Sequence, residues 1–221
     1  MTDMIRPLYD ASNMLILQRM LHETPNPHAR DARTSAQTTH GHWLLLIYRV
    51  PSDPSSARSA IWRETRRLGA LALQHAVCLL PFSDANRAAY AHVARRVEEY
   101  GGEATVLETA APDDAWQAKI VARFNAARDE EYEEVVDETE RFHEEIARER
   151  RKGKFTFAEL EDEESNMERL RKYLAQVQAR DAFGAKGQAH AVAEVEHCAV
   201  ALDAFAQEIY ERQKDATTDA I

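Results

Sequence analysis

The clearest pattern of hydrophobic and polar residues lies between positions 43 and 81. A wholly apolar run from Trp43 to Tyr48 is followed, beyond Pro51, by a segment whose apolar residues recur at helical spacing. A second apolar run from Ala70 to Leu80 is too hydrophobic for a surface segment, and Pro81 ends it. The order predicts a strand, a helix and a second strand, which is typical of an α/β unit.

The predicted helix covers residues 55–68 and begins with two serines that can cap it. We expect Ile61, Leu68 and the ring of Trp62 to face the sheet, with Trp62 as an anchor of the core. We expect Gly69 to end the helix, because glycine adopts the left-handed conformation without strain.

A second helix and a further strand follow Pro81. Ser83 and Asp84 can cap the helix, and Gly101 with Gly102 can end it. Residues 104–108 alternate between apolar and polar side chains, which predicts a strand.

From Pro112 onward the pattern is helical. Apolar residues recur at steps of three or four from Trp116 to Ile146, and Lys152-Gly153-Lys154 interrupts the pattern. Further stripes run from Met167 to Val177 and from Val192 to Ile209. These apolar stripes must pack on one another or on the sheet, so we expect a long-helix hairpin or a three-helix bundle appended to the α/β unit.

The sequence therefore predicts an α+β protein with four parts. Residues 1–41 are expected to form a flexible extension that contains one short amphipathic piece, 42–111 the α/β unit, 112–213 the helical region packed on it, and 214–221 a tail.

Residues 42–185 resemble the N-terminal domain of the chromate resistance protein ChrB family. The strongest similarity lies in the run from Trp43 to Pro51, in Arg58, Trp62, Arg63, Leu68, Gly69 and Ala70, and in the segments 74–77 and 80–81. Weaker similarity continues through residues 101–104, Arg171, Tyr173 and the run Arg180-Asp181-Ala182-Phe183-Gly184. Trp43, Trp62, Gly69 and Gly184 are the structural residues of this shared pattern.

The resemblance implies a ferredoxin-like arrangement, similar to the middle domain of PaaX-type repressors and to Cas2-like proteins. It further implies chromate-responsive control of transcription, with DNA, chromate or a similar oxyanion as the bound partner. A homodimer is expected because Cas2-like units pair through their sheets. Cas2-like nucleases carry an acidic residue at the end of the first strand, where this chain has Tyr48-Arg49-Val50, so we expect no enzyme activity.

The charge of the chain is unevenly distributed. The net charge of −10 argues against wholesale wrapping of nucleic acid, which depends on Lys and Arg at the phosphates. Residues 43–100 are mildly basic, whereas 129–164 hold most of the acidic excess. A basic face on the first half could meet DNA locally, and the second half would repel it.

The sequence predicts a cytoplasmic protein that does not enter the membrane. Its apolar runs are far shorter than the roughly 20 residues that cross a bilayer, and its first residues lack the order of a secretory signal. Cys78 and Cys198 are expected to be small core residues and not a disulfide.

The main candidates for binding are arginines, whose planar guanidinium groups suit phosphate and tetrahedral oxyanions. The alternative is that these arginines form surface ion pairs with Glu64 or with the acidic helices, and that Arg63 only braces Trp62. The predicted anion- or DNA-binding residues are Arg58, Arg63, Arg66, Arg67 and Arg180.

A metal site is the alternative reading of the helical region. Glu140 and His143, and likewise Glu194 and His197, show the Glu-x-x-His spacing found in carboxylate-bridged di-iron bundles. With nine histidines and 38 acidic residues, such pairs also arise by chance. We therefore expect no cofactor. The alternative to a chromate-responsive regulator is a helix-rich interaction or metal-binding module that does not bind DNA.

Overall fold

The computed structural model describes residues 41–51 and 55–218. The predicted amphipathic piece and the rest of the predicted extension, apart from position 41, lie outside the described residues. The elements in chain order are β1 (His42–Arg49), α3 (Ser55–Arg67), β2 (Leu71–Gln74), β3 (Val77–Pro81), α4 (Asp84–Glu99), β4 (Glu103–Ala110), α5 (Asp114–Lys152), α6 (Phe157–Arg180) and α7 (Gln188–Thr218).

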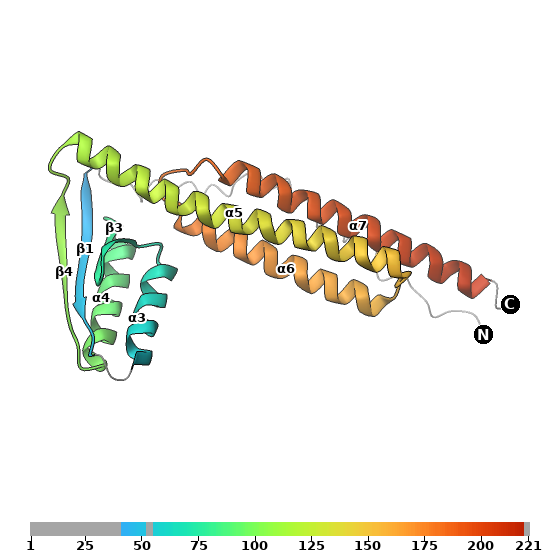
Figure 1. Cartoon of the computed structure of the whole chain (residues 1–221), viewed down its shortest axis with the longest axis horizontal. Coiled ribbons are helices and arrows are strands. Elements are labelled where there is room, and N and C mark those ends of the chain that lie inside the picture. The colour runs from blue at the N-terminus through green and yellow to red at the C-terminus, as the bar shows by residue number, and fades with distance from the viewer. Residues whose placement is uncertain (1–40, 52–54, 219–221) are drawn as a thin grey trace. The chain divides into compact units, whose positions relative to one another are not determined.

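The first six elements form a β-α-β-β-α-β unit around one antiparallel sheet. The strand order is β2-β3-β1-β4, so the first and third strands lie at the centre. Helices α3 and α4 lie together on one face of this sheet (Figure 1), where Ile61 and Val93 pack against Leu44 and Leu46. This arrangement is ferredoxin-like and confirms the predicted α+β class.

The segment predicted as one strand from residue 70 to 80 is a hairpin of β2 and β3, so that prediction was wrong. The chain reverses at Ala76, whose φ of 59° is left-handed, and Leu71 pairs with Leu79 across the hairpin. The backbone N–H of Tyr48 donates to the Ala76 carbonyl at 3.0 Å, which holds the turn against β1. The turn lacks a glycine, asparagine or proline, the residues that usually mark such a reversal.

Helices α5, α6 and α7 run side by side (Figure 1) and enclose a core of their own that includes Phe142, Met167 and Phe205. The predicted stripes occupy the buried faces, although α6 begins at Phe157, earlier than its predicted stripe, and α7 extends past the predicted end to Thr218. Among the described residues, no helix is both long and apolar enough to cross a membrane.

A third cluster joins the sheet to the helical region. Trp43 from β1 is 1% exposed and stacks on Phe124 of α5 at 5.6 Å between ring centroids, and its indole N–H donates to Gln117 at 2.9 Å. Phe183, from the α6–α7 loop, packs against both rings at 5.9 and 5.5 Å. The helical region is therefore packed on the sheet face opposite α3 and α4.

Both cysteines are core residues, as predicted. Cys78 lies in β3 and Cys198 in α7, and both thiols are buried and free. Cys198 Sγ is 3.7 Å from the Thr139 carbonyl oxygen and 3.5 Å from His143 Nε2. Burial, with Glu194 nearby, raises the pKa of Cys198 to about 11, which leaves this thiol protonated and weakly nucleophilic.

Candidate nucleic-acid and anion interface

Helix α3 presents to the sheet a row of residues four positions apart. Ala57, Ile61 and Thr65 form this buried row. Trp62 follows Ile61 by one position, a turn of about 100° around the helix axis, and its side chain is 56% exposed. The prediction that Trp62 anchors the core was wrong, because the buried row is set by Ile61.

The exposed face of α3 carries an aromatic ring among guanidinium groups. Arg58, Trp62 and Arg66 follow one another at four-residue steps, so they lie along one line of the helix surface. The Arg66 guanidinium lies over the Trp62 ring, 5.6 Å from its centroid. Arg63 and Arg67 form the neighbouring line. We call these five exposed residues the α3 face.

The acidic residue of α3 does not neutralise this face. Glu64 instead meets α4, where its carboxylate lies 3.4 Å from His92 Nε2 and 3.9 Å from Arg96 Nη1. In residues 41–51 and 55–214, no carboxylate pairs with the arginines of the α3 face. The alternative that these arginines pair with Glu64 therefore does not describe the structure.

Arg180 lies away from the α3 face, in a network that joins α6 to α5. Its Nε and Nη2 both donate to Glu131 Oε2, at 3.2 and 2.8 Å, and its side chain is only 15% exposed. The next residue, Asp181, accepts backbone N–H groups from Phe183, Gly184 and Ala185. The run from Arg180 to Gly184 thus fixes the α6–α7 loop on α5.

The same network holds Arg128, which the sequence analysis did not single out. Arg128 lies in α5, and its Nη2 is 3.0 Å from the other oxygen of Glu131. Its Nε and Nη1 have no hydrogen-bond partner among the described residues, although the side chain is only 7% exposed. Burial lowers the pKa of Arg128, and the positive charges of Arg180 and Arg66 lower it further, against the opposing effect of Glu131.

Helical periodicity could have located Arg128. It falls four residues after Phe124 and four before Tyr132, and both of these aromatic residues belong to the buried stripe of α5. A charged residue in register with such a stripe is predicted to be buried, and buried charges require partners.

The two Glu-x-x-His pairs do not converge. His197 Nδ1 lies 3.5 Å from Glu194 on an exposed part of α7, whereas His143 faces Cys198 between α5 and α7. Glu140 is exposed. Within the described part of the chain, no group of three or more His, Cys, Asp or Glu residues is placed to hold a metal ion.

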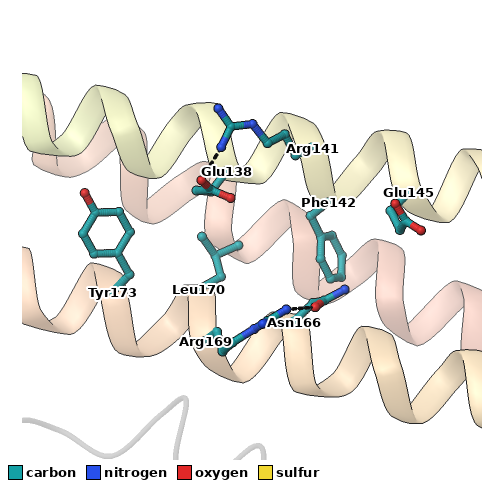
Figure 2. Close-up of a pocket in the computed structure, with 8 residues that line it drawn as sticks. All are labelled: Glu138, Arg141, Phe142, Glu145, Asn166, Arg169, Leu170 and Tyr173. Carbon is teal, nitrogen blue, oxygen red and sulfur yellow. Dashed lines mark hydrogen bonds and ion pairs between the residues drawn. The ribbon is translucent and has the colours of Figure 1, made fainter.

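A groove of about 460 Å³ runs between α5 and α6 (Figure 2). Phe142 and Leu170 contribute its apolar part, and its charged residues bond to their neighbours, Arg141 to Glu138 and Arg169 to Asn166. Because these cations are already engaged, the groove is a poorer candidate for an anion than the α3 face.

Comparison with known proteins identifies the family. A family model described as "Protein ChrB, N-terminal" matches residues 58–216. The chain belongs to the ChrB N-terminal family. Protein ChrB of Cupriavidus metallidurans is 36% identical over 96 residues, which is 43% of this chain and 29% of that relative. The match thus covers less than a third of the relative's length. No solved structure matches the chain.

The family match includes both arginine groups described above. It begins at Arg58, the first residue of the α3 face, and continues through Arg128 and Arg180 into α7. Both the exposed and the buried arginines therefore lie inside the part of the chain that the family defines.

Proposed function

We propose that the chain is a non-catalytic regulatory protein of chromate resistance that binds DNA through the α3 face. The family supports the pathway, and the α3 face supports the mode of binding. The single observation that carries the proposal is a helix surface on which four arginines surround an exposed Trp62 with no carboxylate partner in the described residues.

The chemistry of this face suits the phosphate backbone. Guanidinium groups donate paired hydrogen bonds to phosphate oxygens, and each contact releases counterions from the duplex. The acidic helices α5 and α6 would be repelled by the same backbone, which limits the contact to the α/β unit and orients the protein on DNA.

The test is fluorescence anisotropy with a labelled duplex from the chromate operon promoter and an unrelated duplex of equal length. The double variant Arg63→Gln/Arg67→Gln removes two charges from the α3 face. Its matched control, Arg171→Gln/Lys172→Gln, removes two exposed charges from α6. All proteins are compared by circular dichroism.

We expect the α3 variant to lose at least about tenfold in DNA affinity, because two phosphate contacts are lost, whereas the α6 control should bind like the parent. Equal loss in both variants would mean that only net charge matters. If the unmodified chain binds neither duplex at low salt, the helical interaction module becomes the better account.

Apolar side chains on strands β1 and β4 support a homodimer as the binding unit. Leu45 and Leu107 pair directly across β1 and β4, and Ile47 follows on the same face. Ile47 is 41% and Leu107 46% exposed. Apolar side chains grouped on a sheet face in this way are typical of surfaces that pack on a second copy.

Light scattering after size exclusion tests this dimer. The unmodified chain is expected to elute at twice its monomer mass, and Ile47→Glu/Leu107→Glu at the monomer mass. A monomeric parent protein would refute the dimer without affecting the proposal for the α3 face.

A further inference from the structure

Trp62 is an exposed aromatic side chain without an aromatic neighbour. It is 56% exposed and contacts no other ring in residues 41–51 and 55–214. The other exposed aromatic residues of these ranges, Phe157 and Tyr210, pack on each other with ring centroids 5.3 Å apart. Leaving a tryptophan exposed loses the free energy that burial of its large apolar surface would give, so a partner that covers the ring is favoured.

The Trp62 ring lies between two cations along the helix. Arg58 and Arg66 precede and follow it by four residues, which is about 6 Å of axial rise on each side. The Arg66 guanidinium lies over one face of the ring, 5.6 Å from its centroid, and more than half of the side chain is still open to solvent. A nucleotide strand repeats a related order, since each base is flanked by two phosphates. The order of cation, ring and cation therefore matches that of phosphate, base and phosphate.

A fully paired duplex leaves this ring unused. Paired bases are stacked on one another and present only their edges in the grooves. A tryptophan can meet the face of a base only where the base has left the stack, as in a single strand or a locally unpaired duplex. Charge favours the same form of DNA, because a duplex carries one negative charge per about 1.7 Å, twice the density of one strand, and the chain has a net charge of −10.

Given DNA binding by the α3 face, on which this step depends, we propose that Trp62 stacks on an unpaired base while Arg58 and Arg66 contact the flanking phosphates. The arginines of the face bind phosphates of paired and unpaired DNA alike. The ring adds a preference for DNA with unpaired bases, because stacking of one base on an aromatic side chain changes affinity by about 5- to 150-fold.

The test is fluorescence anisotropy of the full chain with three labelled probes of one sequence. These are a paired duplex, the same duplex with a central unpaired bubble, and the single strand, all at one salt concentration. The parent should bind the bubble at least about fivefold more tightly than the paired duplex. Trp62→Ala should remove this preference and leave affinity for the paired duplex within about twofold of the parent, whereas Trp62→Phe, which keeps a ring, should retain most of the preference.

Two further variants separate stacking from charge and from exposed aromatic surface in general. Arg63→Gln removes a phosphate contact and should weaken binding to all three probes by the same factor. Phe157→Ala removes an exposed ring from α6 and should change none of the affinities. All variants are compared by circular dichroism. Tryptophan emission gives a second readout, since stacking should quench the parent at saturation with the single strand and quench Trp62→Phe much less.

A preference for the bubble alone supports a base held between paired flanks, and a preference for both unpaired probes supports capture of any exposed base. The stacking is overturned if the parent binds all three probes equally, or if Trp62→Ala weakens binding to all three by one factor. Either of these results leaves the α3 face as a DNA surface. Absence of binding to every probe refutes the proposed function, and the stacking with it.

Discussion

Replacing each of two tryptophans by alanine, in separate variants, gives the sharpest test of how the α/β unit is packed. Trp43 is 1% exposed and contacts three aromatic rings with centroids 5.6 to 6.0 Å away, whereas Trp62 is 56% exposed and meets the Arg66 guanidinium. Trp43→Ala leaves a cavity between the sheet and α5, and Trp62→Ala leaves none.

The expected costs differ several-fold. Because the ring is buried, Trp43→Ala is expected to lower the free energy of unfolding by about 3 to 5 kcal/mol. The lost hydrogen bond to Gln117 places the value toward the upper end of that range. Trp62→Ala should cost less than about 1 kcal/mol, the contribution of an exposed cation–π contact. Urea unfolding followed by far-UV circular dichroism measures both variants. With an m-value of about 2 kcal/mol/M, the midpoint of Trp43→Ala should fall by about 2 M.

Equal losses in the two variants would refute the orientation of α3, because they would require the helix to be turned so that Trp62 faces the sheet. A loss below about 1 kcal/mol for Trp43→Ala would refute the packing of α5 on the sheet. An unchanged m-value confirms that each difference reports on stability.

Three further outcomes are expected elsewhere in the chain. At pH 8 the native Cys198 thiol should react with a disulfide reagent far more slowly than the unfolded chain, since its pKa is raised to about 11. Burial raises the pKa of Glu163, so its carboxyl lowers stability as the pH rises from the ordinary glutamate pKa through the raised one. Glu163→Gln should therefore melt higher than the parent at pH 7 and equally at pH 4. Gly102→Ala should destabilise more than Gly101→Ala in urea unfolding, because its Cβ would meet the Arg49 carbonyl oxygen at 2.3 Å, whereas Gly101 has open space and only a left-handed φ.

Much of the fold was predictable because glycines and long stripes mark its elements. Gly69, Gly101 and Gly153 each have a positive φ beyond the end of a helix, and the sequence analysis placed helix ends at these positions. The stripe of α5 repeats over so many turns that small errors in phase do not change its buried face. The helix ends and the buried face of α5 depend on local conformation, which can be predicted from the nearby sequence.

The features that the sequence analysis missed or predicted wrongly depend on small rotations of a helix or on partners that are distant in the sequence. Trp62 differs from Ile61 by one helical step, which a hydrophobicity pattern alone cannot resolve in a short helix. The turn at Ala76 has no marker residue. The contacts of Glu131 with Arg180 join residues 49 positions apart, so the buried arginine network becomes visible only when α5 and α6 are packed together.

The measurement that tests the central claim most directly is the salt dependence of DNA binding. Each phosphate contact contributes about −0.9 to the slope of log affinity against log salt, so Arg63→Gln/Arg67→Gln should make the slope shallower by about 1.8, while Arg171→Gln/Lys172→Gln leaves it unchanged. Identical slopes for the parent and the α3 variant would contradict the claim that the α3 face contacts the DNA backbone.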